Sequence, residues 1–321
     1  GNYCTSLRNI DAFEGTPILE IKQGSHGNIN LYALWTMNLP TVLELSSADT
    51  TVLNSQTPTI IVHPSVSAGK YIANGVEYAA GSTAFAKISD AVSFAEEGST
   101  IYVFAGSYSD SLNISTIGLS IIGPNFGIDA NTTRNSEAII TGVLTIGANN
   151  TTINGVKFSG SSAILLNKAS NVSILNIYSD STGHGYVEAR GNRKGFIYGE
   201  SATVTNFVLK NSYINTGSSV YCKAAIASYG TFNGMTIENN KFTHDYNGST
   251  TCEAINAYNV TGVINIKNND IAYATGNFSL FFGSYYNNCS EINVIDNKIH
   301  GITNLTAGIS ARNCPATCVV N

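Results

Sequence analysis

The sequence predicts an all-β protein, a right-handed parallel β-helix (solenoid) built from stacked coils of three short strands. Three observations favour this fold: a composition rich in turn-forming polar residues, an eight-residue pattern that repeats along the chain, and a second column of segments with nearly the same period. A repeat made only of short strands cannot bury its own apolar face, so it must stack on its neighbours.

The composition departs from that of an average globular protein. Only 12% of the 321 residues are charged, about half the usual share. Their place is taken by 38 Asn, 34 Ser, 31 Thr and 17 Tyr, which suit strands and tight turns. A net charge of −5 with 16 basic residues predicts no nucleic-acid binding. No run of 18 apolar residues is present, so we expect no membrane span.

The repeating pattern has apolar residues at positions one, three and eight and an Asn-like residue at position five. Clear copies occupy 207–214, 235–242, 264–271 and 292–299, with a looser copy at 151–158 and one at 172–176 that lacks the final apolar residue. Successive fifth positions are 21, 35, 28, 29 and 28 residues apart. Asn at this position tolerates the left-handed backbone of a tight corner, and its amide can bond the Asn one coil away.

A second column supports the same register. Its segments are 163–167, 195–199, 224–228, 254–258, 281–285 and 308–312. They recur at nearly the interval of the first pattern, and each precedes a corner or a copy of that pattern. Two columns with one period are the strongest argument for the solenoid.

A helix is predicted over 84–97, just before the coils, with Ser82 or Thr83 as its N-cap and Gly98 as its stop. The apolar residues on one face of this helix are Phe85, Ile88, Val92 and Ala95. An open solenoid end exposes unpaired strand edges, so a capping helix has a physical reason to lie there.

The residues after this helix resemble a known superfamily. Ile101-Tyr-Val-Phe104 and Ala105-Gly-Ser-Tyr108 follow the helix, and Leu119-Ser-Ile-Ile-Gly123 comes next. This order resembles the N-terminal cap and first coil of the pectin-lyase-like superfamily, and 121–125 and 137–142 are similar to its next coils. The resemblance covers about residues 82–313 at the level of the fold, and implies a right-handed parallel β-helix.

We expect the β-helix to occupy 82–321 and a β-rich part to precede it at 1–81. Strands are predicted at 18–21, 29–34, 42–45 and 59–62, and 71–78 indicates a hairpin around Asn74-Gly75. A small β domain and an extension of the solenoid both fit this part. The chain begins Gly1-Asn2-Tyr3-Cys4, which indicates a trimmed product without its targeting segment.

The superfamily contains calcium-dependent lyases, polygalacturonases and methylesterases, but their signatures are incomplete here. The Asp cluster of a calcium site is missing, and we predict no metal and no cofactor. Gly183-His184-Gly185 is similar to a polygalacturonase motif but lacks the paired Asp residues. Phe196-Ile-Tyr-Gly199 is similar to a methylesterase motif, but Gly195 stands where the nucleophilic Asp is needed.

One region still concentrates charge, since residues 180–200 hold six charged residues in a charge-poor chain. It also falls in the longest interval between coils. If the protein is an enzyme, its candidate catalytic residues are Asp180, His184, Glu188 and Arg190. A solvated loop explains the same facts.

Tyrosines supply the candidate binding residues. They recur about once per coil, at Tyr198, Tyr229, Tyr258 and Tyr285. Aromatic side chains at the spacing of neighbouring strands can bind sugar rings, while nearby Asn and Ser supply hydrogen bonds. The alternative is a tyrosine stack that only covers the surface of the solenoid.

Six cysteines, with no CxxC pair and no nearby His, favour disulfides in an oxidising compartment. Cys222 and Cys252 occupy the same place in adjacent coils, which predicts a bridge between them. The remaining cysteines are Cys4, Cys289, Cys314 and Cys318. Cys289 can pair with either C-terminal cysteine, and the one left over can pair with Cys4 of another chain. That would favour end-to-end filaments, which non-reducing electrophoresis tests.

Two functions remain open. The first is an extracellular or cell-surface β-helix with a structural, adhesive or glycan-contacting role, whose partners are a polysaccharide or glycan surface and further copies of itself. The second is a polysaccharide lyase or glycoside hydrolase that acts on an acidic polysaccharide through residues 180–200. Ten Asn-x-Ser/Thr sequons permit glycosylation without arguing for it, because so Asn-rich a chain contains about as many by chance.

Overall fold

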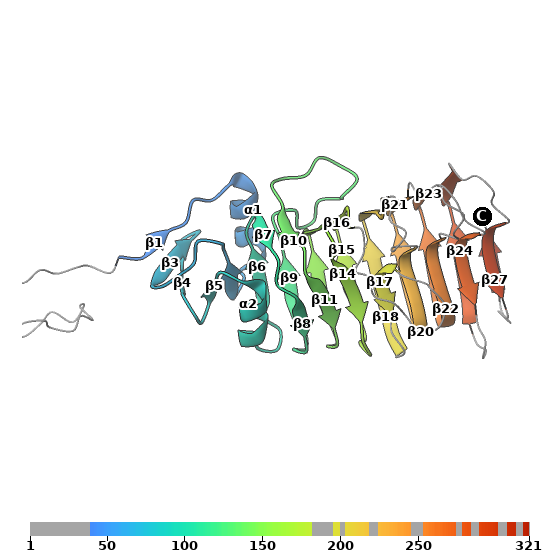
Figure 1. Ribbon diagram of the computed structural model, residues 1–321, viewed down its shortest axis with the longest axis horizontal. Helices are drawn as coiled ribbons and strands as arrows, with labels where there is room; N and C mark the ends of the chain where they lie inside the picture. The colour runs from blue at the N-terminus through green and yellow to red at the C-terminus, as the bar shows by residue number, and fades with distance from the viewer. Residues whose placement is uncertain are drawn as a thin grey trace, which may run out of the picture.

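The computed structural model describes residues 39–181, 195–199, 203–217, 224–244, 253–273, 278–283, 289–300, 307–312 and 317–320. Within these ranges the chain is mostly β, and long sheets of parallel strands run the length of the molecule (Figure 1). The architecture is therefore the all-β parallel solenoid that the sequence predicts. The expected strands at 18–21 and 29–34 lie outside the described residues.

The strands form three faces, in which each strand pairs with its counterpart in the next coil. The first face is the eight-stranded sheet β7 (Gly106–Tyr108), β10 (Ala138–Ile140), β13 (Lys157–Phe158), β16 (Tyr178–Ser179), β19 (Tyr213–Asn215), β21 (Lys241–His244), β23 (Asp270–Tyr273) and β26 (Lys298–His300). The second face contains β8 (Leu112–Ile114), β11 (Val143–Ile146), β14 (Ala163–Leu166), β17 (Gly195–Gly199), the first halves of β20 (Ala224–Glu238) and β22 (Glu253–Lys267), then β24 (Phe278–Gly283) and β27 (Ala307–Arg312). The third face contains β5 (Ala84–Phe85), β2 (Ile60–Val62), β6 (Thr100–Val103), β9 (Ser120–Ile122), β12 (Thr152–Asn154), β15 (Ser173–Leu175), β18 (Thr203–Lys210), the second halves of β20 and β22, then β25 (Cys289–Ile295) and β28 (Thr317–Val320). Strands β20 and β22 continue through the corner between the second and third faces, so these two faces belong to one 17-stranded sheet.

The corner between the third and first faces is formed by position five of the repeating pattern. All six residues at this position have positive φ, from 53° to 72°: Gly155, Asn176, Asn211, Asn239, Asn268 and Asp296. The side-chain amide of Asn239 also donates to Oδ1 of Asn211 one coil away, at 2.8 Å. Both the left-handed corner and the amide bond between coils are confirmed.

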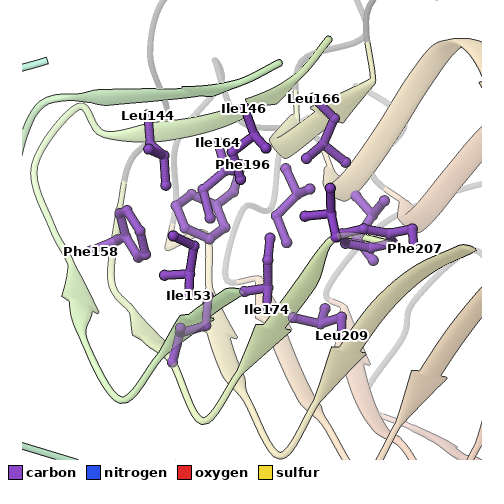
Figure 2. Close-up of a cluster of buried hydrophobic side chains, with 14 of the residues drawn as sticks. Leu144, Ile146, Ile153, Phe158, Ile164, Leu166, Ile174, Phe196, Phe207 and Leu209 are labelled. Atoms are coloured by element: carbon purple, nitrogen blue, oxygen red, sulfur yellow. The ribbon is translucent and has the colours of Figure 1, made fainter. Parts of the chain in front are cut away.

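The apolar positions of the pattern stack into one continuous core. Ile153, Ile174 and Leu209 lie in register on successive strands of the third face, and all three are fully buried (Figure 2). Burying a side chain of this size contributes about 1.5–3 kcal/mol. Position eight of the copy that lacks an apolar residue is Ser179, which aligns with Phe158 and is also buried. A small hydroxyl residue therefore takes the place of an apolar one there.

The capping helix exists but is shorter than the predicted range 84–97. Helix α2 spans Ile88–Phe94 and buries Ile88, Ala91 and Val92 against the start of the core. Its N-cap is Lys87, so the prediction of Ser82 or Thr83 is wrong. The physical reason is strand pairing, because Ala84 and its neighbour form β5 against β2 and cannot also be helical.

The predicted hairpin is confirmed. Strands β3 (Lys70–Ala73) and β4 (Val76–Ala79) pair antiparallel around Asn74 and Gly75, whose φ angles are 49° and 76°. Positive φ at both residues is typical of a two-residue type I′ turn. β1 (Thr41–Val42) adds to the hairpin as a parallel strand. Helix α1 (Ser47–Gln56), which the sequence analysis missed, begins at a capping box between Ser46 and Asp49.

The hairpin and α1 cover the outer side of the first strands of the third face. A second apolar cluster joins them there, with Leu53 from α1, Tyr78 from the hairpin, and Ile61 and Tyr102 from β2 and β6. The Tyr102 hydroxyl donates to the buried carboxylate of Asp49. β2 thus lies before residue 82 and still pairs within the solenoid, whereas the division into two domains stays a prediction.

Candidate functional site

Of the four predicted catalytic residues, the structure describes Asp180. It directly follows β16, and its Oδ2 lies 2.8 Å from Nζ of Lys157 in the preceding coil. The two side chains are partly exposed, Lys157 at 22% and Asp180 at 36%. His184, Glu188 and Arg190 lie outside the described residues, so their convergence on Asp180 stays a prediction.

The predicted tyrosine series is described in part. Tyr198 on β17 is 4% exposed and lies opposite Ala227 of the next coil. Tyr229 lies two residues beyond Ala227, so it does not share a register position with Tyr198. The offset arises because 31 residues separate the two tyrosines while paired positions here are 29 apart. The side chain of Tyr258 and the whole of Tyr285 lie outside the described residues.

Most of the cysteines in the predicted disulfides lie outside the residues that the structure describes. Cys222, Cys252 and Cys314 are not among the described residues. Cys289 begins β25, and the backbone of Cys318 pairs with that of Ile292, but their side chains are not described. The Cys222–Cys252 bridge and the pairing of Cys289 therefore stay predictions.

A different row of side chains lies on the first face, at position seven of the repeating pattern. We call Lys157, Tyr178, Tyr213 and Lys241 the Lys–Tyr row. They occupy the same register position on β13, β16, β19 and β21 and are all partly exposed. Because adjacent strands lie about 4.8 Å apart, the row extends along the solenoid axis for about 14 Å.

Contacts along the row hold its side chains in place. The rings of Tyr178 and Tyr213 meet edge to face, with centroids 5.1 Å apart and an interplanar angle of 86°. Nζ of Lys157 lies 5.2 Å from the Tyr178 centroid, and Nζ of Lys241 lies 4.9 Å from the Tyr213 centroid. At partly exposed sites such cation–π contacts contribute about 0.5–1 kcal/mol each. The row is thus a preorganised pair of rings with an ammonium group at either end.

The surroundings of Tyr178 raise the pKa of its hydroxyl above the ordinary value. Burial is the largest cause that raises the pKa of Tyr178, and the neighbouring Tyr213 and Asp180 raise it further. Lys157 opposes this by a smaller amount. A tyrosine is neutral at physiological pH even at its ordinary pKa, and a raised pKa only extends that range, so the phenol can donate as well as accept a hydrogen bond.

A polar column runs beside the row. Asp180, Asn215 and Thr243 follow Tyr178, Tyr213 and Lys241 by two residues each, which places them on the same side of the pleated strands. The Thr243 hydroxyl donates to the Tyr213 hydroxyl at 3.3 Å. These groups add hydrogen-bonding capacity next to the aromatic rings.

The first face carries charge beyond Lys241. Asp270 and Lys298 continue the same register position on β23 and β26. His300 lies next to Asp270, with Nε2 2.5 Å from Oδ1, and both side chains are about two-fifths exposed. Exposed pairs of this kind add little stability.

Residues 123–137, which we call the arm, border the Lys–Tyr row on the corner side. The arm leaves the third face after β9, arches over the strands and returns to the first face at β10 (Figure 1). Its contacts follow successive corners: Gly127 N–H donates to Asn154 Oδ1, Arg134 Nη1 to the Asn176 carbonyl, and Ala130 N–H to the Asn211 carbonyl. The last contact is made by Asn239, whose amide donates to Asp129 at 2.7 Å.

A glycine at the first of these corners makes room for the arm. Gly155 has φ of 72°, and a Cβ at this position would lie 2.2 Å from the backbone nitrogen of Phe126. A residue with a side chain therefore fits there only if the backbone of the arm shifts away. This explains why the loose copy of the pattern has Gly at position five where the other copies have Asn or Asp.

The chemistry of the first face suits binding. Among the described residues no three His, Cys, Asp or Glu side chains cluster as metal ligands would, and no helix there is long and apolar enough to cross a membrane. What the Lys–Tyr row offers is two rings and two ammonium groups, with amide and hydroxyl groups beside them. Stacking and hydrogen bonding to a ligand are available to such a set.

The Lys–Tyr row was missed by the sequence analysis, although its signal was present. Position seven of the copies reads Lys157, Tyr213, Lys241, Asp270 and Lys298, and the shortened copy places Tyr178 at the same point. Lys, Tyr and Asp share no apolar or turn-forming property, so position seven has no period that distinguishes it from ordinary solvated surface.

Comparisons with known proteins identify no family. No family model matches the chain, and no curated protein sequence matches it. One solved structure, PfbA, a surface adhesin of Streptococcus pneumoniae, is similar over 69% of this chain and 88% of the adhesin chain, with 14% identity and a TM-score of 0.19. We transfer nothing from the adhesin to this chain, because that TM-score is too low to support an argument.

Proposed function

We propose that this protein is an extracellular or cell-surface β-helix that contacts glycans, in an adhesive or structural role, through the Lys–Tyr row. The observation that carries the proposal is the in-register row of two tyrosines between two lysines on the first face. We also propose that the coil is right-handed, as connections between parallel strands of one sheet almost always are.

Glycans fit the row for geometric and chemical reasons. Sugar rings stack on aromatic side chains, and the strand spacing of about 4.8 Å is close to the length of one sugar residue. Asn215 and Thr243 offer hydrogen bonds to hydroxyl groups. Lys157 and Lys241 add ammonium donors, which also accommodate an anionic substituent. A chain of about three sugar residues spans the row.

Removal of the two rings tests this proposal. We expect the double variant Tyr178→Ala/Tyr213→Ala to bind glycans about fivefold to 150-fold more weakly, because each ring contributes about 0.5–1.5 kcal/mol to a stacking contact. The measurement is a glycan array followed by titration calorimetry on the chains that bind. Tyr229→Ala serves as the comparison, because Tyr229 belongs to the tyrosine series and lies off the row. Loss of binding in Tyr229→Ala alone, or unchanged binding in the double variant, contradicts the proposal.

A second candidate is a polysaccharide lyase or glycoside hydrolase, favoured by the carboxylate of Asp180 at the edge of the row. A hydrolase needs two carboxylates flanking the scissile bond, and Glu188 is the partner predicted from the sequence. The test is the release of reducing or unsaturated sugar ends from acidic polysaccharides. Release that disappears in Asp180→Asn supports the enzyme, whereas binding without any release supports the contact role.

A further inference from the structure

The arm and the Lys–Tyr row cover the same four coils. Each corner that the arm contacts, at Asn154, Asn176, Asn211 and Asn239, precedes a member of the row by two or three residues. The described contacts of the arm with these corners stop at the coil of Asn239, and Lys241 is the last member of the row. The arm therefore forms a border along one side of the row, matched to its length.

We propose that Asp129 is a positioning residue, which holds the tip of the arm beside the Lys–Tyr row so that the row selects unbranched glycan chains. This inference rests on the proposed function and deepens it by naming the class of chain that binds. A chain stacked on the rings of the row runs along the solenoid axis. A branch that projects toward the corner side would meet the arm, and steric conflict of this kind is a general source of specificity.

The base of the arm is firmly held. The side chain of Asn125 is fully buried: its Oδ1 accepts from the Asn135 backbone N–H, and its Nδ2 donates to the Glu137 carboxylate. Arg134 forms a two-point contact with Glu137, at 2.6 and 3.2 Å, and both side chains are less than one-fifth exposed. Bidentate charge-assisted pairs of this type fix geometry well. The base thus acts as the attachment from which the tip extends.

The tip depends on Asp129. Its Oδ1 accepts from both the backbone N–H and the side-chain amide of Asn131, which organises the turn at the tip. Its Oδ2 accepts from the Asn239 amide at 2.7 Å, and the adjacent Ala130 N–H donates to the Asn211 carbonyl. One carboxylate therefore shapes the tip and fastens it to the corner of the fourth coil of the row.

Binding of matched linear and branched oligosaccharides tests the inference. The probes are hexamers of β-1,4-glucan, β-1,4-mannan and α-1,4-galacturonan, each with a side-branched form of the same backbone. For a backbone that binds, we expect the wild-type protein to bind the linear form at least tenfold more tightly than the branched form. In Asp129→Ala that ratio falls at least fivefold, while affinity for the linear form changes by less than threefold. Asp129→Asn has a single acceptor oxygen, so it can accept from Asn131 or from Asn239 but not from both, and we expect its ratio to lie between those of the wild-type protein and Asp129→Ala.

Asn239→Gly and Asn268→Gly form a matched pair of controls. Both residues have left-handed backbone, with φ of 56° and 53°, which Gly adopts without strain. Only Asn239 contacts Asp129, so we expect the linear-to-branched ratio to fall in Asn239→Gly and to persist in Asn268→Gly. Hydrogen exchange of 127–132 should quicken in Asn239→Gly and in Asp129→Ala.

The outcomes separate this inference from the proposed function. Absence of binding to all three linear chains, or binding that survives Tyr178→Ala/Tyr213→Ala, contradicts the proposed function. A linear-to-branched ratio near one in the wild-type protein overturns the inference alone, provided that binding depends on the two tyrosines. The inference alone is also overturned if the linear-to-branched ratio stays unchanged in Asp129→Ala although hydrogen exchange of residues 127–132 quickens.

Discussion

Individual Asn side chains hold adjacent coils together, because their amides form hydrogen bonds with backbone groups of the neighbouring coil near the corners. At position six of the pattern, Asn240 is 2% exposed and its Oδ1 accepts from the Ser212 backbone N–H in the preceding coil at 3.0 Å. Its Nδ2 donates to the Leu209 carbonyl and to Oδ1 of Asn269 in the next coil, both at 3.0 Å. Asn269 repeats the arrangement by donating to Asn297. The result is a buried amide ladder that satisfies buried backbone groups next to the corners.

Asn240→Ala should therefore lower the free energy of unfolding by about 1–3 kcal/mol, because it leaves a buried donor and a buried acceptor without partners. Urea unfolding followed by circular dichroism measures the change. Asn113→Ala is the control, since Asn113 lies exposed on β8, and surface changes usually stay within about 0.5 kcal/mol. Equal losses in the two variants would contradict the role of the ladder.

Neighbouring residues differ in how far the sequence could predict them. The left-handed conformation of Asn239 was predicted, because a recurring Asn at a fixed spacing has a backbone reason. The burial of Asn240 and the row containing Tyr213 were not, because an Asn, Ser, Lys or Tyr column has no apolar period that distinguishes it from surface. The contact between Asp129 and Asn239 joins residues 110 apart, and no local pattern indicates a partner at that distance.

At the scale of elements, tertiary pairing overrode local signals. The apolar period over 84–97 indicates a helix, but Ala84 and Phe85 pair with Ile61 and Val62 and become a strand. Only Ile88–Phe94 then forms α2. Conversely, the Asn74-Gly75 turn was predicted correctly because its conformation is set by the two residues themselves. Elements that depend on local chemistry are predictable from the chain, and elements that depend on distant strands are not.

The arm provides a test at the same scale, using two glycines with nearly equal φ. Gly75→Ala adds a methyl group to open space at φ of 76°, so we expect only the strain of a left-handed residue, about 1–2 kcal/mol. Gly155→Ala adds the same strain at φ of 72° and also drives a Cβ into the backbone of Phe126. We therefore expect a larger loss of stability in thermal unfolding.

Only Gly155→Ala should also loosen the arm. Hydrogen exchange of residues 123–137 is expected to quicken in this variant and to match the wild-type protein in Gly75→Ala. If both variants lost the same stability and the arm stayed protected in both, the close approach of the arm to Gly155 would not matter energetically.

At the scale of the whole molecule, the two larger apolar clusters of the described residues raise the question of how the N-terminal part relates to the coils. The main core runs through the solenoid and includes Phe207, whose ring lies 5.5 Å from that of Phe232 in the next coil. The second cluster includes Leu53 of α1 and lies on the outer side of the third face. Stability in a solenoid is approximately a sum over units and their nearest neighbours. A cavity created by truncating a core side chain should therefore destabilise the coils beside it more than remote coils.

Phe207→Ala and Leu53→Ala probe this division. Both remove a buried side chain, at a cost of about 3–5 and 2–5 kcal/mol respectively. If residues before 82 extend the solenoid through β2, hydrogen exchange in Leu53→Ala should quicken in the hairpin and also in β6 and β9, whose outer side chains Tyr102 and Ile122 share the cluster. Exchange that quickens in the hairpin and α1 alone would instead indicate a separate small domain. Phe207→Ala should quicken exchange in β15, β18 and β20 and leave α1 protected, because no described contact joins that helix to these coils directly.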